Sequence, residues 1–215
     1  MHLRLLFKPV TFQRMTWVAM GLLVTSCGLA QEPVKEPTAP RWPSGLIMAI
    51  KTKDLPAVKE SLEKGAEINA KSNDGQTPLM YAVGFSSTPA IITLLLDAGA
   101  EINARSNDGS TPLLYAARNA STPEIVTLLL DQGAEIEARN NVGSTPLMVA
   151  ARYSSTPAIM TLLLAMGADI EARDKYGNTP LMVAALYSSI PAIVTLLLEK
   201  GAEINARTND GSTPL

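Results

Sequence analysis

The side chains that most often carry out catalysis or bind metals are nearly missing from this chain. It contains one Cys and one His, Cys27 and His2, and both stand among the first 27 residues. A disulfide, a Cys/His metal site or a catalytic triad with a His base therefore cannot form in the remainder of the sequence. We expect a protein that is not an enzyme.

Acidic side chains recur at one position, directly after a Gly-Ala pair. They are Glu67, Glu101, Glu135, Asp169 and Glu203. General acid–base catalysis relies on individual carboxyl groups in special surroundings. A regular series instead indicates a structural or solvated position.

The Asn-Asp-Gly stretches share three letters with a calcium-binding loop, but the other ligands do not follow. Counted back from Gly109, the first and third ligand positions of an EF-hand fall on Ala104 and Ser106, and the twelfth falls on Tyr115. The sequence has no Gly-rich phosphate loop either. We therefore expect no metal and no cofactor.

The charge balance argues against a nucleic-acid partner. Of the 18 basic residues, Arg4, Lys8 and Arg14 lie in a leader that has no acidic residue, so acidic residues outnumber basic ones in the rest of the chain. A protein that binds nucleic acid needs a basic surface. The composition, with 47% hydrophobic but only 5% aromatic residues, favours helices packed through aliphatic side chains.

The leader predicts export. Its apolar run, from Met15 to about Val24, is too short for a comfortable transmembrane helix and fits the core of a signal peptide. The residues Val24-Thr25-Ser26-Cys27 resemble the lipobox of bacterial lipoproteins. This resemblance implies a signal peptide over residues 1–27, cleavage before Cys27, and a membrane anchor through a lipid on Cys27.

Two details of the leader bear on the location of the mature protein. In lipoproteins an Asp after the Cys favours the inner membrane; Gly28 instead implies the outer membrane, facing the periplasm. The alternative is ordinary cleavage after Ala30, which would leave a soluble periplasmic protein. Residues 28–43, which follow Cys27, are expected to form a semi-extended, Pro-rich tether. Its reach is about 50 Å at ~3.1 Å per residue.

From Thr77 onward the chain repeats itself with a period of 34 residues. Each unit starts with Thr-Pro, in which Thr77 suits the N-cap of a helix and Pro78 its first position. We expect the hydroxyls of Thr88, Thr122 and Thr156 to cap the second helices in the same way, whereas Ile190 cannot. The second helices should end at glycines, Gly99 being the first, before an Asn-Asp-Gly type turn.

These features resemble the ankyrin repeat: Thr-Pro-Leu at the first helix, Leu-Leu-Leu in the second, and Gly-Ala-acid-Ile after it. The resemblance covers residues 44–215 and implies an all-α solenoid of helix-turn-helix units joined by hairpin-like loops. The family's usual His after Thr-Pro-Leu is replaced by Met80, Leu114, Met148 and Met182, and the period is one residue longer. Tetratricopeptide repeats share the period of 34, but their Trp, Tyr and Gly positions are missing.

The period defines the expected units. They are an N-terminal capping repeat over 44–76, repeats over 77–110, 111–144, 145–178 and 179–212, and the start of an incomplete repeat at 213–215. In the capping repeat Lys59, Glu60 and Glu63 replace neutral positions, as expected at the end of a solenoid. We expect Thr213–Leu215 to be disordered or loosely laid on the last unit, and residues 181–200 to expose apolar surface.

In the ankyrin family partners usually bind the concave side, which consists of hairpin tips and the exposed side of the first helices. Carried over by position, the candidate partner-binding residues are Phe85, Asn107, Asp108, Arg118, Asn119, Val142, Arg152, Tyr153, Lys175, Tyr176 and Tyr187. Aromatic and Arg side chains are enriched in binding hot spots. The alternative is that the aromatic rings only pack against the neighbouring Ser-Ser-Thr-Pro turn.

The sequence therefore predicts an exported protein-protein interaction module, a membrane-anchored scaffold or binding lipoprotein. One alternative is an immunity or inhibitor protein directed against a toxin. The other is an accessory region of an enzyme whose catalytic domain lies beyond the C-terminus. The sequence does not identify the protein partner.

Overall fold

The computed structural model describes residues 42–85, 88–119, 123–154 and 156–214. Their regular structure is helical, without strands, which confirms the predicted all-α class. The helices are α1 (Ser44–Lys51), α2 (Leu55–Glu63), α3 (Pro78–Gly84), α4 (Pro89–Asp97), α5 (Pro112–Asn119), α6 (Pro123–Asp131), α7 (Pro146–Tyr153), α8 (Ala158–Ala165), α9 (Pro180–Tyr187) and α10 (Pro191–Glu199). The predicted signal peptide with Cys27, and residues 28–41 of the predicted tether, lie outside the described residues.

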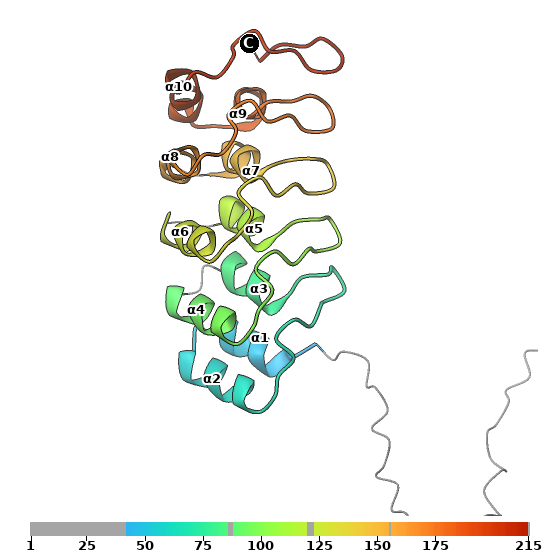
Figure 1. Cartoon of the computed structure of the whole chain (residues 1–215), viewed down its shortest axis with the longest axis vertical. Coiled ribbons are helices and arrows are strands. Elements are labelled where there is room, and N and C mark those ends of the chain that lie inside the picture. Colours follow the sequence, from blue (N-terminus) through green and yellow to red (C-terminus); the bar gives the residue numbers. More distant parts are fainter. Residues whose placement is uncertain (1–41, 86–87, 120–122, 155, 215) are drawn as a thin grey trace, which may run out of the picture. The chain divides into compact units, whose positions relative to one another are not determined.

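Within the compact unit Thr38–Leu215, the helices form two rows (Figure 1). The inner row is α1, α3, α5, α7 and α9, and each member contacts the next. The outer row contains α2, α4, α6, α8 and α10, and each outer helix pairs with the inner helix that precedes it. Each helix pair is thus covered by its neighbours in the chain, which is the organisation of a solenoid.

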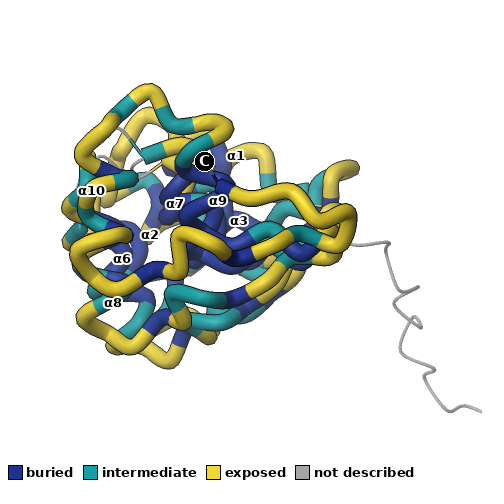
Figure 2. Tube along the Cα trace, turned by 90° about the horizontal axis from the view of Figure 1, so that it is seen from above, coloured by how far each residue is buried: buried dark blue, intermediate teal, exposed yellow. Residues whose placement is uncertain are grey.

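The hydrophobic core lies where the two rows meet, as the dark segments in Figure 2 show. The Leu of the Thr-Pro-Leu triplet at the start of α3, α5, α7 and α9 is fully buried, and α4, α6, α8 and α10 contribute the central Leu of their Leu-Leu-Leu run. Burial of one such side chain stabilises the fold by roughly 1.5–3 kcal/mol. The buried Leu residues of these triplets are Leu79, Leu113, Leu147 and Leu181.

The first helices are capped largely as the sequence predicts. The hydroxyl oxygens of Thr77, Thr145 and Thr179 each accept a hydrogen bond from the backbone N–H three residues later, at 3.4 Å. Thr111 differs, because its buried hydroxyl has no hydrogen-bond partner. The capping hydrogen bond is therefore formed by Thr77, Thr145 and Thr179 and is missing at Thr111.

The capping prediction for Thr88 and Thr156 is wrong, whereas Ile190 makes no side-chain capping bond, as expected. Thr88 precedes α4 but makes no side-chain capping bond, and α8 begins one residue later than expected, after Pro157. Thr122 lies outside the described residues. Thr88 and Thr156 are exposed, so water can satisfy the first N–H groups of these helices and a capping hydroxyl is not required.

The Met side chain that follows Thr-Pro-Leu accepts a backbone hydrogen bond in two of the units. The sulfur of Met80 accepts from the Thr77 backbone N–H at 3.4 Å, and Met182 does the same with Thr179. A thioether is a weak acceptor. Leu114 offers no acceptor at the equivalent position, next to the orphaned Thr111.

The two end units differ in polarity. Lys59, Glu60 and Glu63 of α2 are exposed, as expected, and form ion pairs one helical turn apart. In the last unit Leu186 is 67% and Leu198 is 37% exposed. The expected apolar surface is therefore present at those positions.

The expectation for this unit was too broad, however. Leu181 and Met182 are buried, because α9 packs against α7. Thr213 is exposed while Pro214 is buried, so that this part of the chain lies on the last unit. Leu215 lies outside the described residues.

Candidate functional site

The hairpin tips are joined to one another by backbone and amide hydrogen bonds. The backbone N–H of Asn141 donates to the carbonyl of Asp108 at 2.8 Å, and its side-chain amide donates to the carbonyl of Asn107 at 2.9 Å. Asn107 bonds the preceding tip in the same way, through Asn73 and Asp74. These Asn side chains hold the tips in register.

A row of arginines supports the base of the hairpins. Arg139 donates to the carbonyl of Gly143 at 3.1 Å, in its own hairpin, and to the carbonyl of Arg173 at 2.5 Å, in the next. Arg105 and Arg173 repeat this pattern in their own units. Hydrogen bonds from a charged donor are stronger than neutral ones, so each hairpin is fixed relative to the next.

The acidic series after Gly-Ala has a structural position. From the second unit onward, the backbone N–H of the acidic residue donates to an Asn or Glu side chain of the preceding unit, as in the 2.9 Å bond from Glu101 to Asn69. The acidic side chains themselves are exposed. The further bonds of this kind run from Glu135 to Asn103, from Asp169 to Glu137 and from Glu203 to Glu171.

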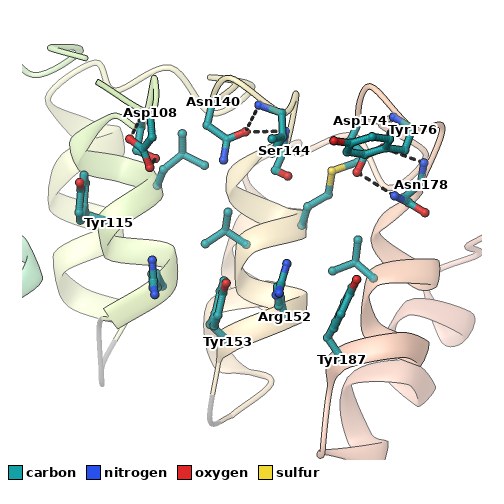
Figure 3. Close-up of a pocket in the computed structure, with 17 residues that line it drawn as sticks. Asp108, Tyr115, Asn140, Ser144, Arg152, Tyr153, Asp174, Tyr176, Asn178 and Tyr187 are labelled. Atoms are coloured by element: carbon teal, nitrogen blue, oxygen red, sulfur yellow. Dashed lines mark hydrogen bonds between the residues drawn. The ribbon is translucent and has the colours of Figure 1, made fainter. Parts of the chain in front are cut away.

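A groove of about 340 Å³ lies between the hairpins and the inner helices α5, α7 and α9 (Figure 3). We call it the inner groove. Its lining comes from three successive units and combines carboxylate, amide, aromatic, apolar and Arg side chains. The lining residues are Asp108, Ser110, Leu114, Tyr115, Arg118, Asn140, Val142, Ser144, Met148, Val149, Arg152, Tyr153, Asp174, Tyr176, Asn178, Val183 and Tyr187.

The hairpin edge of the inner groove carries fixed carboxylates. Partial burial of Asp108 favours a higher pKa, but hydrogen bonds from Ser106 and Ser110 outweigh it and lower the pKa below the ordinary 3.8. Asp174 accepts from the backbone N–H groups of Tyr176 and Asn178, both at 2.9 Å. Asp108 therefore gives this edge a negative charge at neutral pH.

Between the edges stands Tyr115, a half-buried phenol. Its burial raises its pKa above 10.0, and the charge of Asp108 acts in the same direction. Hydrogen bonding to Ser106 and the charge of Arg118 oppose the change without cancelling it. Tyr115 is therefore a neutral hydrogen-bonding group in the groove.

The opposite edge, at the ends of the inner helices, is positive and aromatic. The guanidinium carbon of Arg118 lies 4.6 Å from the ring centroid of Tyr153. Arg152 lies 5.1 Å from the same centroid and 4.1 Å from that of Tyr187. Figure 3 shows Arg152 between the two rings. Such cation–π contacts contribute roughly 0.5–1 kcal/mol each at exposed sites.

The aromatic residues of the first units form a separate cluster. Trp42 packs on Tyr81 with 5.2 Å between ring centroids, and Tyr81 stacks on Phe85 at 5.8 Å. Lys51 lies over both Tyr81 and Phe85. This cluster does not border the inner groove.

The structure brings together part of the candidate set. Asp108, Arg118, Val142, Arg152, Tyr153, Tyr176 and Tyr187 line the inner groove. Phe85 belongs to the separate aromatic cluster, Asn107 is engaged with the preceding tip, and Asn119 and Lys175 do not line the groove. Tyr153 and Tyr187 contact Arg side chains; part of the Ser-Ser-Thr-Pro turns lies outside the described residues.

Sequence reasoning missed several residues of the inner groove. Asp174, Asn140, Ser144 and Asn178 flank the tips, and the sequence analysis considered only the tip pairs. Tyr115 lies on the fifth position of its repeat, where Val149 and Val183 stand in later units. The fifth position of the repeat changes from Tyr to Val along the chain, and this variation was the signal that could have identified Tyr115 and Val149 as groove residues.

No group of three or more His, Cys, Asp or Glu side chains in the described part of the chain is placed to hold a metal ion. No helix there is long and apolar enough to cross a membrane.

The family model described as ankyrin repeats (three copies) matches residues 46–140 and 122–208. The chain belongs to the ankyrin-repeat family. A search of curated proteins found no match. Ankyrin repeats suggest a protein-protein interaction module, and the inner groove is the surface of this ankyrin array where hairpins and first helices meet.

Proposed function

We propose that this ankyrin array binds a segment of a protein partner in the inner groove. The observation that carries the proposal is the Arg–Tyr series of Arg118, Tyr153, Arg152 and Tyr187, which is exposed along one edge. Arg and Tyr side chains are the types that dominate binding energy at protein interfaces. The apolar side chains of Val142 and Tyr176, 44% and 63% exposed, supply further contact area on the other edge.

The rigidity of the groove supports the same proposal. Its hairpins are tied to one another by the Asn and Arg hydrogen bonds, and its helices are packed through a common core. A surface ordered before binding loses less conformational entropy on association. Such a groove suits tight recognition of a partner segment.

A photocrosslinking experiment tests the site. A photoreactive phenylalanine analogue placed at Tyr176 should crosslink the partner in cells, because that side chain borders the groove. The control position is Thr161, which is exposed on the outer helix α8. Equal crosslinking from Thr161, or a partner captured only from there, would remove the inner groove as the binding site.

For the cellular location, we propose an exported lipoprotein anchored through Cys27. Its support is the sequence alone, in the signal-like leader and the residues Val24-Thr25-Ser26-Cys27. Radiolabelled palmitate should be incorporated into the wild-type chain and lost in Cys27→Ala. Unchanged labelling of that variant would refute the anchor and leave cleavage after Ala30 as the alternative.

A further inference from the structure

Neither of the two groove arginines, Arg118 and Arg152, forms an ion pair within the described residues. The ion pairs there are those of Lys59 with Glu63 and Lys64 with Glu60, both in the first unit. Arg118 and Arg152 instead lie against the faces of aromatic rings. Both are exposed, so a partner can reach them.

The stacking leaves the hydrogen-bonding edges of these side chains available. A guanidinium group binds a ring through its face, while its five N–H donors point outward in its plane and match a carboxylate. The rings of Tyr153 and Tyr187 hold Arg152 on both sides and restrict its rotation. The stacked arginine is therefore preorganised for a bidentate contact.

The arrangement also places two like charges near one ring. Arg118 and Arg152 lie 4.6 and 5.1 Å from the same Tyr153 centroid. Their mutual repulsion is a cost in the free protein, and an anion between or beside them would relieve it.

The other edge of the groove sets the orientation of a ligand. Asp108 and Asp174 border the hairpin side and would repel a second row of carboxylates. Between the edges lie apolar side chains, of which Val149 is half-buried and Val183 is buried. An extended segment projects alternate side chains about 7 Å apart on one side, so two acidic residues separated by one position can face the arginine edge.

We infer that the partner segment is acidic and binds with two carboxylates paired to Arg118 and Arg152. This inference rests on the proposed function and specifies its ligand. The carboxylates meet the edges of the guanidinium groups, and the remainder of the segment covers the apolar floor. Affinity should fall as salt concentration rises, because the exposed ion pairs are screened.

The experiment is a selection of displayed random 12-residue peptides on the full chain, followed by affinity measurements on synthetic copies. The selected peptides should carry two acidic residues separated by one position. Binding should weaken at least tenfold in the variant Arg118→Gln/Arg152→Gln. The matched control is Lys53→Gln/Lys200→Gln, which removes the same charge from exposed sites outside the groove and should change affinity less than twofold.

A third variant separates this inference from the proposed function. Val142→Ala/Tyr176→Ala removes apolar contact area from the opposite edge and should weaken any segment that binds the groove. Peptides sensitive to this variant but not to the arginine variant would overturn the acidic partner and retain the groove. Peptides sensitive to neither variant, or no selected peptides at all, would overturn both. Circular dichroism of each variant confirms that the fold is kept.

Discussion

At the scale of single residues, the same sequence letter has different physical surroundings from unit to unit. Thr145 caps its helix through the Met148 N–H, whereas the buried hydroxyl of Thr111 has no partner. A satisfied cap contributes stability, and an unsatisfied buried hydroxyl costs it. The repeats are therefore not equivalent in energy.

Replacement of each Thr by the similarly shaped Val tests this difference. Thr145→Val should lower the free energy of unfolding by about 1 kcal/mol, because a capping bond is lost. Thr111→Val should leave it unchanged or raise it, because no bond is lost and a buried polar atom is removed. Urea denaturation measures both values. Equal losses in the two variants would contradict the orphaned state of Thr111.

The carboxyl group of Asp108 provides a second prediction at this scale. Its pKa is lowered because hydrogen bonds from Ser106 and Ser110 outweigh the effect of partial burial. A lowered pKa in the folded state means that the carboxylate stabilises the fold above pH 3.8 and that this contribution is lost as the pH falls through the folded pKa. The stability difference between wild type and Asp108→Asn should therefore shrink below pH 3.8.

A carboxyl titration by NMR checks the cause. Ser106→Ala should raise the pKa of Asp108 toward its ordinary value. Asp210 serves as an internal control, because its lowered pKa comes first from its own hydrogen bond with Thr208. A pKa of Asp108 that does not move in Ser106→Ala would show that the Ser106 hydrogen bond does not set it.

At the scale of elements, the hairpins depend on glycine for two separate reasons. Gly143 has a φ of +85°, a backbone conformation that residues with a side chain rarely adopt. A Cβ there would also lie 3.0 Å from the backbone nitrogen of Lys175. Gly211 has a φ of +88° but no atom within 4 Å of such a Cβ. The first glycine meets both a conformational and a packing requirement, and the second only the conformational one.

These two glycines form a matched pair for mutation. Gly211→Ala should lower the free energy of unfolding by roughly 1–2 kcal/mol, from backbone strain alone. Gly143→Ala should cost more, because the next hairpin must also move. Chemical denaturation gives both values. A larger loss in Gly211→Ala would contradict the close approach of successive hairpins.

At the scale of the whole molecule, stability comes from contacts between neighbouring units. The helix α7 contacts α5 and α9, and the helix α6 contacts α4 and α8. In a solenoid a unit with neighbours on both sides is held more firmly than one at an end. Local opening should therefore be easiest in the first and last units.

Amide hydrogen exchange followed by mass spectrometry tests this gradient. Peptides from α5, α6 and α7 should exchange more slowly than those from α1, α2 and α10, because each inner unit must lose two interfaces to open. Leu147→Ala, at a fully buried position, should speed exchange in the neighbouring units as well. Uniform exchange rates along the array would show instead that it opens as one cooperative unit.

Most of the fold could be predicted because it depends on short-range features. The Thr-Pro pair, the glycine after the second helix and the period of 34 residues each act within one unit, so the order of helices and turns follows from them. The wrong predictions concern Thr88 and Thr156, where exposure to water removed the need for a cap. Whether a Thr before a helix forms a side-chain cap thus depends on the surroundings of that Thr in the fold.

The sequence by itself determined the repeat, the scarcity of residues for catalysis, and the types of side chain on the hairpins and first helices. Only the tertiary structure decided which of them meet. Arg118 and Tyr153 are 35 positions apart, and they stack because consecutive inner helices lie side by side. Asp174 and Tyr115 line the groove, whereas the side chain of Asn107 hydrogen-bonds the preceding tip. These contacts between units depend on how the units stack, and no local sequence pattern encodes that geometry.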